Sequence, residues 1–325
     1  MRKPSGLMKK TSAHSGPERP LVTPDEAGRR LDNYLMSRLK GVPRSRIYRM
    51  IRGGEVRING RRARPDSRLE EGNEVRIPPV RVAATGPVQA PPADRVSWLT
   101  DRIVYEDRDL LVLNKPAGLA VHGGSGISFG AIELLRAARP DAPALELVHR
   151  LDRETSGCLI VAKRRPALRR LHEQFREGTI QKHYVTLLCG KMPGTERLID
   201  EPLLTTQRRG GERHVVVAPE GKPARSRFTP RRRFRDATLV DVIIETGRTH
   251  QIRVHAAHIG HPVAGDERYG SADDAITRRY GLQRLFLHAD RVSFDSPRGE
   301  QVIRAECPLD PELVAVVERL ESAAS

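Results

Sequence analysis

The sequence predicts an α+β fold, in which a largely antiparallel sheet domain follows a small helix–helix–hairpin module. Between residues 98 and 318, strand-like segments outnumber helical segments and do not alternate regularly with them, which favours a mixed, largely antiparallel sheet over a doubly wound one. The charge is also unevenly divided. The 325 residues carry a net charge of +16, and residues 1–97 hold 21 Lys and Arg against 10 Asp and Glu, whereas the remainder holds 36 against 31. We therefore expect a basic front module joined to a nearly balanced body.

The basic excess and the cysteine content restrict the class of protein. Such a charge suggests a polyanionic partner, usually nucleic acid or an anionic membrane surface. No apolar run approaches the roughly 18 residues of a membrane span, and the basic N-terminus lacks the apolar stretch of a secretory signal. Cys158, Cys189 and Cys307 are too widely spaced for a disulfide framework or a zinc site. These features predict a cytoplasmic protein without a membrane partner.

The front of the chain predicts a short arm and a compact module. Residues 1–20 are polar and aperiodic, which is typical of a disordered basic arm. Residues 21–80 predict two helices, the first starting at Asp25 and ending at the Gly-Val-Pro of residues 41–43. The second, shorter helix carries arginines on its exposed face: Arg44, Arg46, Arg49 and Arg52. Asn59-Gly60 then predicts a hairpin.

The rest of the chain is divided into a linker, a large domain and a tail. Residues 81–97 are rich in Pro and Ala and predict a linker, residues 98–318 a single domain, and residues 319–325 a tail. Helices are predicted at 129–138, 166–177 and 249–259. Strands are predicted at 103–105, 110–114, 158–162, 183–188, 214–217, 238–244 and 285–288.

Charged side chains are concentrated in residues 149–157, directly before the apolar strand predicted at 158–162. Asp152 lies there between Arg150 and Arg153. Guanidinium groups keep a neighbouring aspartate ionised at neutral pH. This suits a nucleophile or an electrostatic partner better than a general acid. Composition alone is equally consistent with a surface salt-bridge cluster.

Two further segments have the composition of ligand-binding loops. In residues 114–124 a strand runs into a Pro/Gly loop, which suits close approach by a ligand but is also typical of a surface turn. In residues 245–255 a strand ends at Gly247, and Thr249 is a candidate cap for a helix that carries Arg253 one turn later. The histidines at 250, 255, 258 and 261 lack the spacing of a zinc helix, so we predict no metal.

Six motifs in chain order resemble those of the pseudouridine synthase family that modifies ribosomal RNA, in its large-subunit branch. They lie at residues 114–118, 149–157, 182–184, 247–255, 265–270 and 285–288. The front module resembles the RNA-binding module of the ribosomal protein S4 type, through residues 30–32, 56–60 and 75–77. Residues 41–48 and 121–126 indicate one subgroup of the branch, because a sister subgroup differs after His122.

The resemblance implies a pseudouridine synthase catalytic domain behind an S4-like domain, acting on 23S ribosomal RNA without a cofactor or metal. It implies that Asp152 is the catalytic aspartate and that Arg253 is the buried cation paired with it. Tyr184 would stack on the uracil and shuttle the proton from C5. Arg150 would either fill the space that the flipped-out nucleotide leaves or hold that nucleotide. Whether Asp152 attacks the base, attacks the sugar or removes a sugar proton stays open.

The remaining basic site residues are expected to contact RNA phosphates. They are Lys115 and Arg248 in the large domain, and Arg44, Arg46 and Arg49 in the front module. The alternative interpretation of the front-module arginines is a solvated helix face, which is less favoured.

Two other functions are considered. A non-catalytic RNA-binding ribosome-assembly factor would share the basic front module, and it is distinguished by whether Asp152, Tyr184 and Arg253 converge in one cleft. A hydrolase using Asp152 and Glu154 is disfavoured, because two carboxylates so close together on one extended segment cannot easily flank one bond. We expect a monomer. The target uridines and the docking of the front module stay open.

Overall fold

The computed structural model describes residues 16–24, 26–39, 42–80, 91–123, 129–140, 142, 145–207, 213–271 and 275–323. The chain forms two compact units, Met1–Ala90 and Pro91–Ser325. Asp25, most of the predicted arm and residues 81–90 of the predicted linker lie outside the described residues. Among the described residues, no helix is long and apolar enough to cross a membrane.

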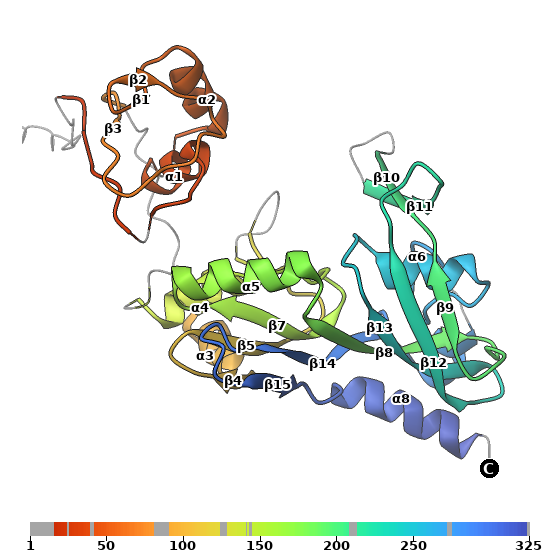
Figure 1. The fold of residues 1–325 in the computed structure, drawn as a ribbon. Helices are drawn as coiled ribbons and strands as arrows, with labels where there is room; N and C mark the ends of the chain where they lie inside the picture. Colours follow the sequence, from red (N-terminus) through yellow and green to blue (C-terminus); the bar gives the residue numbers. More distant parts are fainter. Residues whose placement is uncertain are drawn as a thin grey trace, which may run out of the picture. The chain divides into compact units, whose positions relative to one another are not determined.

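The first unit is built from two helices and a three-stranded sheet (Figure 1). The helices are α1 (Leu31–Arg38) and α2 (Arg44–Arg52). The strands lie in the order β2 (Arg61–Arg62), β1 (Arg57–Ile58) and β3 (Val75–Arg76), all antiparallel. The predicted end of the arm at residue 20 is wrong, because Glu18 already belongs to the folded module. Its backbone exchanges two hydrogen bonds with that of Ile77 (3.0 and 2.8 Å).

A buried carboxylate fixes α2 against α1. Asp32 accepts hydrogen bonds from two of the Arg30 guanidinium nitrogens (2.7 and 3.1 Å) and from the hydroxyl of Tyr48 on α2 (2.9 Å). The bonds from Arg30 hold the pKa of Asp32 below its usual range. The apolar side of α2 contributes Ile47, Met50 and Ile51 to the core, which leaves its arginines on the outer side.

The second unit contains one large mixed sheet, as predicted. Its main order is β4-β5-β7-β14-β8-β13-β12-β9, with β15 paired to β14 and β6 paired to β7. The bounds are β4 Ile103–Glu106, β5 Leu110–Lys115, β6 Glu146–Leu147, β7 Ser156–Ala162, β8 Gln181–Cys189, β9 Arg197–Asp200, β12 Arg225–Arg233, β13 Ala237–Ile244, β14 Leu287–Asp295 and β15 Val302–Glu306. A separate hairpin pairs β10 (Leu203–Gln207) with β11 (Arg213–Val217).

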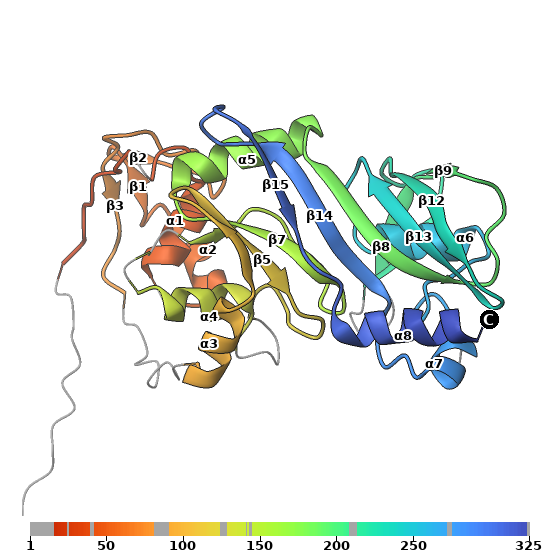
Figure 2. The same cartoon turned by 90° about the horizontal axis from the view of Figure 1, so that it is seen from below.

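Helices cover both faces of this sheet (Figures 1 and 2). The helices are α3 Ala93–Thr100, α4 Ala131–Ala138, α5 Arg165–Glu177, α6 Gln251–His258, α7 Ala275–Tyr280 and α8 Pro311–Ser322. Two predicted boundaries are wrong: α3 begins inside the predicted linker, and α8 runs through most of the predicted tail and buries Leu320. Both segments are amphipathic helices whose apolar residues pack into the domain core.

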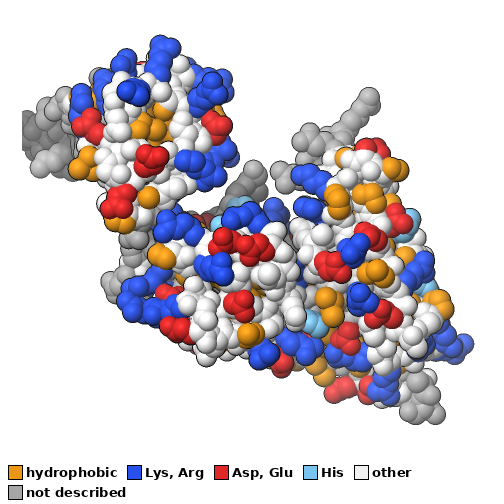
Figure 3. All heavy atoms as spheres, in the orientation of Figure 1, with side chains coloured by type: hydrophobic (Ala, Val, Ile, Leu, Met, Phe, Trp, Pro, Cys, Tyr) orange, Lys and Arg blue, Asp and Glu red, His pale blue; other side chains and the backbone are white. Residues whose placement is uncertain are grey.

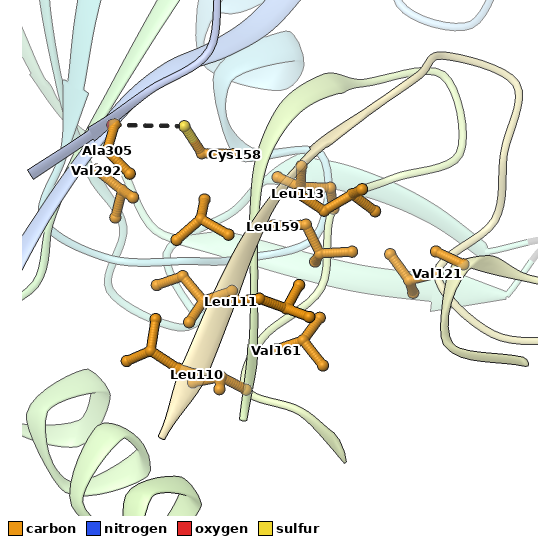
Figure 4. Packing of buried hydrophobic residues seen from close by; sticks show 14 of the residues in the cluster. Leu110, Leu111, Leu113, Val121, Cys158, Leu159, Val161, Val292 and Ala305 are labelled. Atoms are coloured by element: carbon orange, nitrogen blue, oxygen red, sulfur yellow. Dashed lines mark hydrogen bonds between the residues drawn. The ribbon is translucent and has the colours of Figure 1, made fainter. Parts of the chain in front are cut away.

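The apolar core of the second unit lies around β5 and β7. Leu110, Leu111 and Leu113 of β5 meet Leu159 and Val161 of β7 (Figure 4). Both strands are buried along their whole length, which explains their nearly continuous apolar sequences.

The described strand pairs are antiparallel except β7–β14, which is parallel and aligns His288 with Ser156 and Ala289 with Gly157. Gly157 has φ +105°, and a Cβ atom there would lie 2.1 Å from the Ala289 carbonyl oxygen. Only glycine allows this close approach at the centre of the sheet.

Replacing this glycine should destabilise the second unit strongly. We expect Gly157→Ala to lower the free energy of unfolding by about 3 kcal/mol, since overpacking adds to the cost of positive φ. Gly299→Ala is the matched control: its φ is +75° but a Cβ would meet nothing within 4 Å, so it should cost about 1 kcal/mol. Urea unfolding followed by the fluorescence of Trp98, the single tryptophan, measures both; equal losses would contradict the argument.

Candidate active site

The pocket that contains most of the predicted site residues lies where the Asp152 loop, β8, β13 and α6 meet. It is lined by Arg150, Asp152, Tyr184, Arg248 and Arg253. Further lining residues were not predicted as site residues: Leu151, Thr155, Ile244, Gly247, Thr249, His250, Gln251, Ile252 and Leu287. The pairing of β7 with β14, and of β14 with β8, brings these distant segments together.

Asp152 lies on the turn that enters β7, with its side chain 23% exposed. Its backbone carbonyl accepts a hydrogen bond from the Thr155 amide (3.2 Å), which closes the turn. The next residue, Arg153, exchanges hydrogen bonds with Gly118: the Gly118 amide donates to the Arg153 carbonyl, and the Arg153 guanidinium donates to the Gly118 carbonyl (both 2.9 Å). The loop after β5 therefore holds the backbone next to Asp152 in place.

The prediction that Lys115 contacts RNA phosphate is wrong. Its side chain is fully buried at the end of β5. Its ammonium donates to the backbone carbonyls of Pro116 (2.9 Å), Leu119 (2.9 Å) and Arg153 (3.1 Å). Burial lowers the pKa of Lys115 to about 7. Lys115 thus joins the Pro/Gly loop to the Asp152 turn and does not reach the surface.

Arg253 lies in the pocket, but its close partner is Asp266 rather than Asp152. Two guanidinium nitrogens donate to the two Asp266 oxygens at 2.7 Å each. Burial alone would lower the pKa of Arg253, but Asp266 at close range and Asp152 at longer range raise it. The expected pairing of Arg253 with Asp152 is therefore wrong. From its position on α6, the Arg253 guanidinium instead meets the carboxylate of Asp266 in the 265–270 loop.

Tyr184 occupies the position on β8 that faces the pocket. Alternate residues of a strand face opposite sides, so Val185 and Leu187 pack with α8 while Tyr184 packs with the core beside Asp152. Burial, and then the charge of Asp152, raises the pKa of Tyr184 well above its ordinary value. The side chain is therefore a neutral phenol at neutral pH.

His250 is the pocket residue that the sequence analysis weighed only as a metal ligand. It has a left-handed backbone (φ 53°, ψ 21°) at the start of α6. Its Nε2 lies 3.8 Å from Oδ2 of Asp152, and its Nδ1 lies 2.7 Å from the hydroxyl of Tyr269. Burial lowers the pKa of His250 to about 4, so the ring is neutral. The left-handed conformation, which sequence periodicity does not show, turns this ring into the pocket.

The start of α6 is held by Gln251 rather than by the predicted cap Thr249. The Gln251 side-chain oxygen accepts from the Thr246 hydroxyl (2.7 Å) and the Arg248 amide (3.0 Å). Its nitrogen donates to the Arg225 carbonyl (2.9 Å). The Thr249 cap is therefore wrong, and the helix is anchored to β12 instead.

The other predicted side chains lie at the rim or in the first unit. Arg150 and Arg248 are exposed, and the Arg248 Nε donates to the Pro223 carbonyl (3.0 Å). Glu154 is exposed beside Arg153 (3.6 Å). In the first unit Arg44 and Arg49 are exposed, whereas Arg46 lies 3.7 Å from Glu55.

Each unit matches a known protein family. Residues 109–258 match the model described as RNA pseudouridylate synthase, and residues 29–75 match the S4 domain. The subgroup predicted from residues 41–48 and 121–126 is confirmed by relatives named "Ribosomal large subunit pseudouridine synthase C". The Yersinia pestis protein is 54% identical over 90% of this chain and 92% of its own. The Escherichia coli (strain K12) protein is 52% identical over 93% and 96%.

Solved structures share the fold of the second unit. Human RNA Pseudouridylate Synthase Domain Containing 1 has a TM-score of 0.56 and 26% identity, covering 73% of this chain and 97% of that chain. Human RNA Pseudouridylate Synthase Domain Containing 4 has a TM-score of 0.60 and 24% identity, covering 70% and 96%. The predicted fold class is confirmed.

Removing the Lys115 ammonium should destabilise the second unit. Lys115→Met keeps the length of the side chain but leaves three buried carbonyls without their donor. Each unsatisfied group costs about 1–3 kcal/mol, so we expect a loss of at least about 3 kcal/mol in urea unfolding. Lys222→Met at an exposed position should change the free energy of unfolding by less than about 0.5 kcal/mol. If the two variants unfold alike, Lys115 does not hold the loop.

Proposed function

The chain belongs to the RNA pseudouridylate synthase family, and we propose that it isomerises specific uridines of 23S ribosomal RNA to pseudouridine, with Asp152 as the essential group. Its curated relatives are named for the ribosomal large subunit, and an S4 domain precedes its catalytic unit. The observation that carries the proposal is the convergence of Asp152, Tyr184 and Arg253 on one pocket. A purely RNA-binding protein has no need for this arrangement.

The reaction breaks one bond and forms another within the same nucleotide. The bond between uracil N1 and ribose C1′ breaks, the uracil turns, C5 bonds to C1′, and the proton on C5 is transferred to N1. No electrons are gained or lost overall. Asp152 acts as a carboxylate, by attack on the base, attack on the sugar or removal of a sugar proton.

Tyr184 and the rim arginines complete the proposed site. The target uridine must leave its stack to reach a half-buried carboxylate. The exposed Arg150 guanidinium at the rim is suited to occupy the vacated space, and Arg248 to contact a phosphate. Tyr184 offers a ring face for the uracil, and its neutral phenol beside Asp152 suits transfer of the C5 proton.

Capture of the RNA is assigned to α2 of the first unit. Side chains of Lys and Arg gather over the part of this unit where Figure 1 places α2 (Figure 3). Arg44 and Arg49 are exposed there, and we expect them, with Arg46, to contact phosphates. Activity as a monomer in the cytoplasm is part of the proposal.

Asp152→Asn should leave a folded, RNA-binding protein with no turnover, because the amide cannot act as nucleophile or base. Pseudouridine is measured by mass spectrometry of a 23S ribosomal RNA transcript after incubation with the variant. Glu154→Gln is the matched control and should retain activity, since this carboxylate is exposed beside Arg153. Measurable pseudouridine from Asp152→Asn would falsify the assignment of Asp152 as the essential group. Loss of activity in Glu154→Gln would favour a mechanism in which Asp152 and Glu154 act as a pair.

Removing two arginines from α2 should weaken RNA binding and its salt dependence. For Arg44→Ala/Arg49→Ala we expect the slope of log K against log salt to become shallower by about 1–2. The control Arg197→Ala/Arg304→Ala removes the same charge from exposed strand positions of the second unit. Filter binding at several salt concentrations measures both. Equal effects of the two pairs would show that net charge alone, and not α2, determines binding.

A further inference from the structure

A directed row of hydrogen-bonding groups ends at the Asp152 carboxylate. The backbone amide of Val215 donates to the hydroxyl oxygen of Tyr269 (3.2 Å). That hydroxyl lies 2.7 Å from Nδ1 of His250. On the other side of the same ring, Nε2 lies 3.8 Å from Oδ2 of Asp152. The row thus joins β11, the 265–270 loop and α6 to the turn before β7.

The bond from Val215 to Tyr269 favours one tautomer of His250. The Val215 amide can only donate, so the Tyr269 oxygen is an acceptor in that bond and its single proton is free to point to Nδ1. Nδ1 then accepts, and the proton of the neutral imidazole resides on Nε2. In this tautomer the Nε2–H faces the carboxylate.

His250 takes the place beside Asp152 that was expected for Arg253. The Arg253 fork is occupied by Asp266 at 2.7 Å, and its guanidinium also lies over the Tyr269 ring (5.1 Å). A neutral N–H donor orients a carboxylate without neutralising its charge, whereas a bidentate guanidinium would stabilise the resting ion and reduce its reactivity.

We propose that His250 is a positioning residue, which presents Nε2–H to the Asp152 carboxylate and is held in that tautomer by Tyr269 and the Val215 amide. The present 3.8 Å separation shortens to a hydrogen bond when substrate fills the pocket, as such contacts commonly do. The proposal rests on the proposed role of Asp152. It also makes the β10–β11 hairpin part of the support of the catalytic group.

The left-handed backbone of His250 agrees with this role. Only two non-glycine residues of the described chain have positive φ, Asn59 at a hairpin turn and His250. Asparagine and histidine adopt this conformation more often than most other non-glycine residues do. At His250 the conformation directs the ring into the pocket rather than to the solvent.

Single-turnover kinetics on saturating 23S ribosomal RNA transcript test the proposal. We expect His250→Ala to reduce the rate constant about 100-fold, because a misplaced carboxylate loses its aligned geometry, with RNA affinity within about threefold of the wild type. His250→Gln should recover much of the loss, since its terminal amide N–H reaches about as far as Nε2–H. His258→Ala, at an exposed position on the same helix, is the matched control and should behave as wild type.

The Tyr269 hydroxyl provides a second, independent measurement. Tyr269→Phe keeps the ring over Arg253 but removes the group that fixes the tautomer, and we expect about a 10-fold loss. Because both residues act through one row, His250→Ala/Tyr269→Phe should be no slower than His250→Ala alone. Circular dichroism and thermal unfolding check that each variant folds.

Additive losses in the double variant, wild-type rates in both single variants, or losses confined to RNA affinity would each overturn the proposal. A failure of the proposed function would give a different result, namely pseudouridine formation by the Asp152→Asn variant. If His250→Ala does not fold, the other two variants still decide the question. Both must retain RNA affinity. Tyr269→Phe must react more slowly than the wild type, and His250→Gln must keep most of the wild-type rate.

Discussion

The parallel pair β7–β14 is the contact on which the site depends. It aligns Ser156 with His288 and Gly157 with Ala289, and β14 pairs in turn with β8. Asp152 precedes β7 by one turn and Tyr184 lies on β8, so this register alone brings the carboxylate next to the phenol. A one-residue slip would turn Tyr184 towards α8 and remove it from the pocket.

A buried polar network reinforces that register from below the pocket. The Ser156 hydroxyl lies 2.8 Å from His288 Nδ1 and accepts from Arg284 (2.9 Å), which also donates to Asp310 (3.1 Å). His288 Nε2 lies 3.1 Å from the Cys307 carbonyl. These hydrogen bonds favour one arrangement of the strands, since a shifted register would break them. On the other side of the turn, Lys115 performs the same task through three carbonyls.

The fold class and five residues of the pocket were accessible from the sequence, whereas the partners of several side chains were not. Apolar runs at 110–114 and 158–162 identify buried strands, and the motif order identifies Asp152, Tyr184 and Arg253. The sequence could not show that the Lys115 side chain turns inward or that Arg253 selects Asp266, because either choice depends on the direction of a side chain in the folded state. His250 was missed for a similar reason: helical spacing does not reveal a left-handed residue before the first turn.

The burial of several cationic side chains also limits how much of the net charge can act on RNA. The +16 of the chain does not act on RNA as a whole, since the cationic groups of Lys115, Arg253 and Arg284 are buried against internal acceptors. Such groups are largely shielded from salt and contribute to the shape of the site. The exposed arginines of α2 and the pocket rim instead face the solvent, where their attraction for phosphates falls with ionic strength. Salt should therefore weaken the encounter with RNA much more than it disturbs the support of Asp152, because that support includes the buried hydrogen bonds of Lys115.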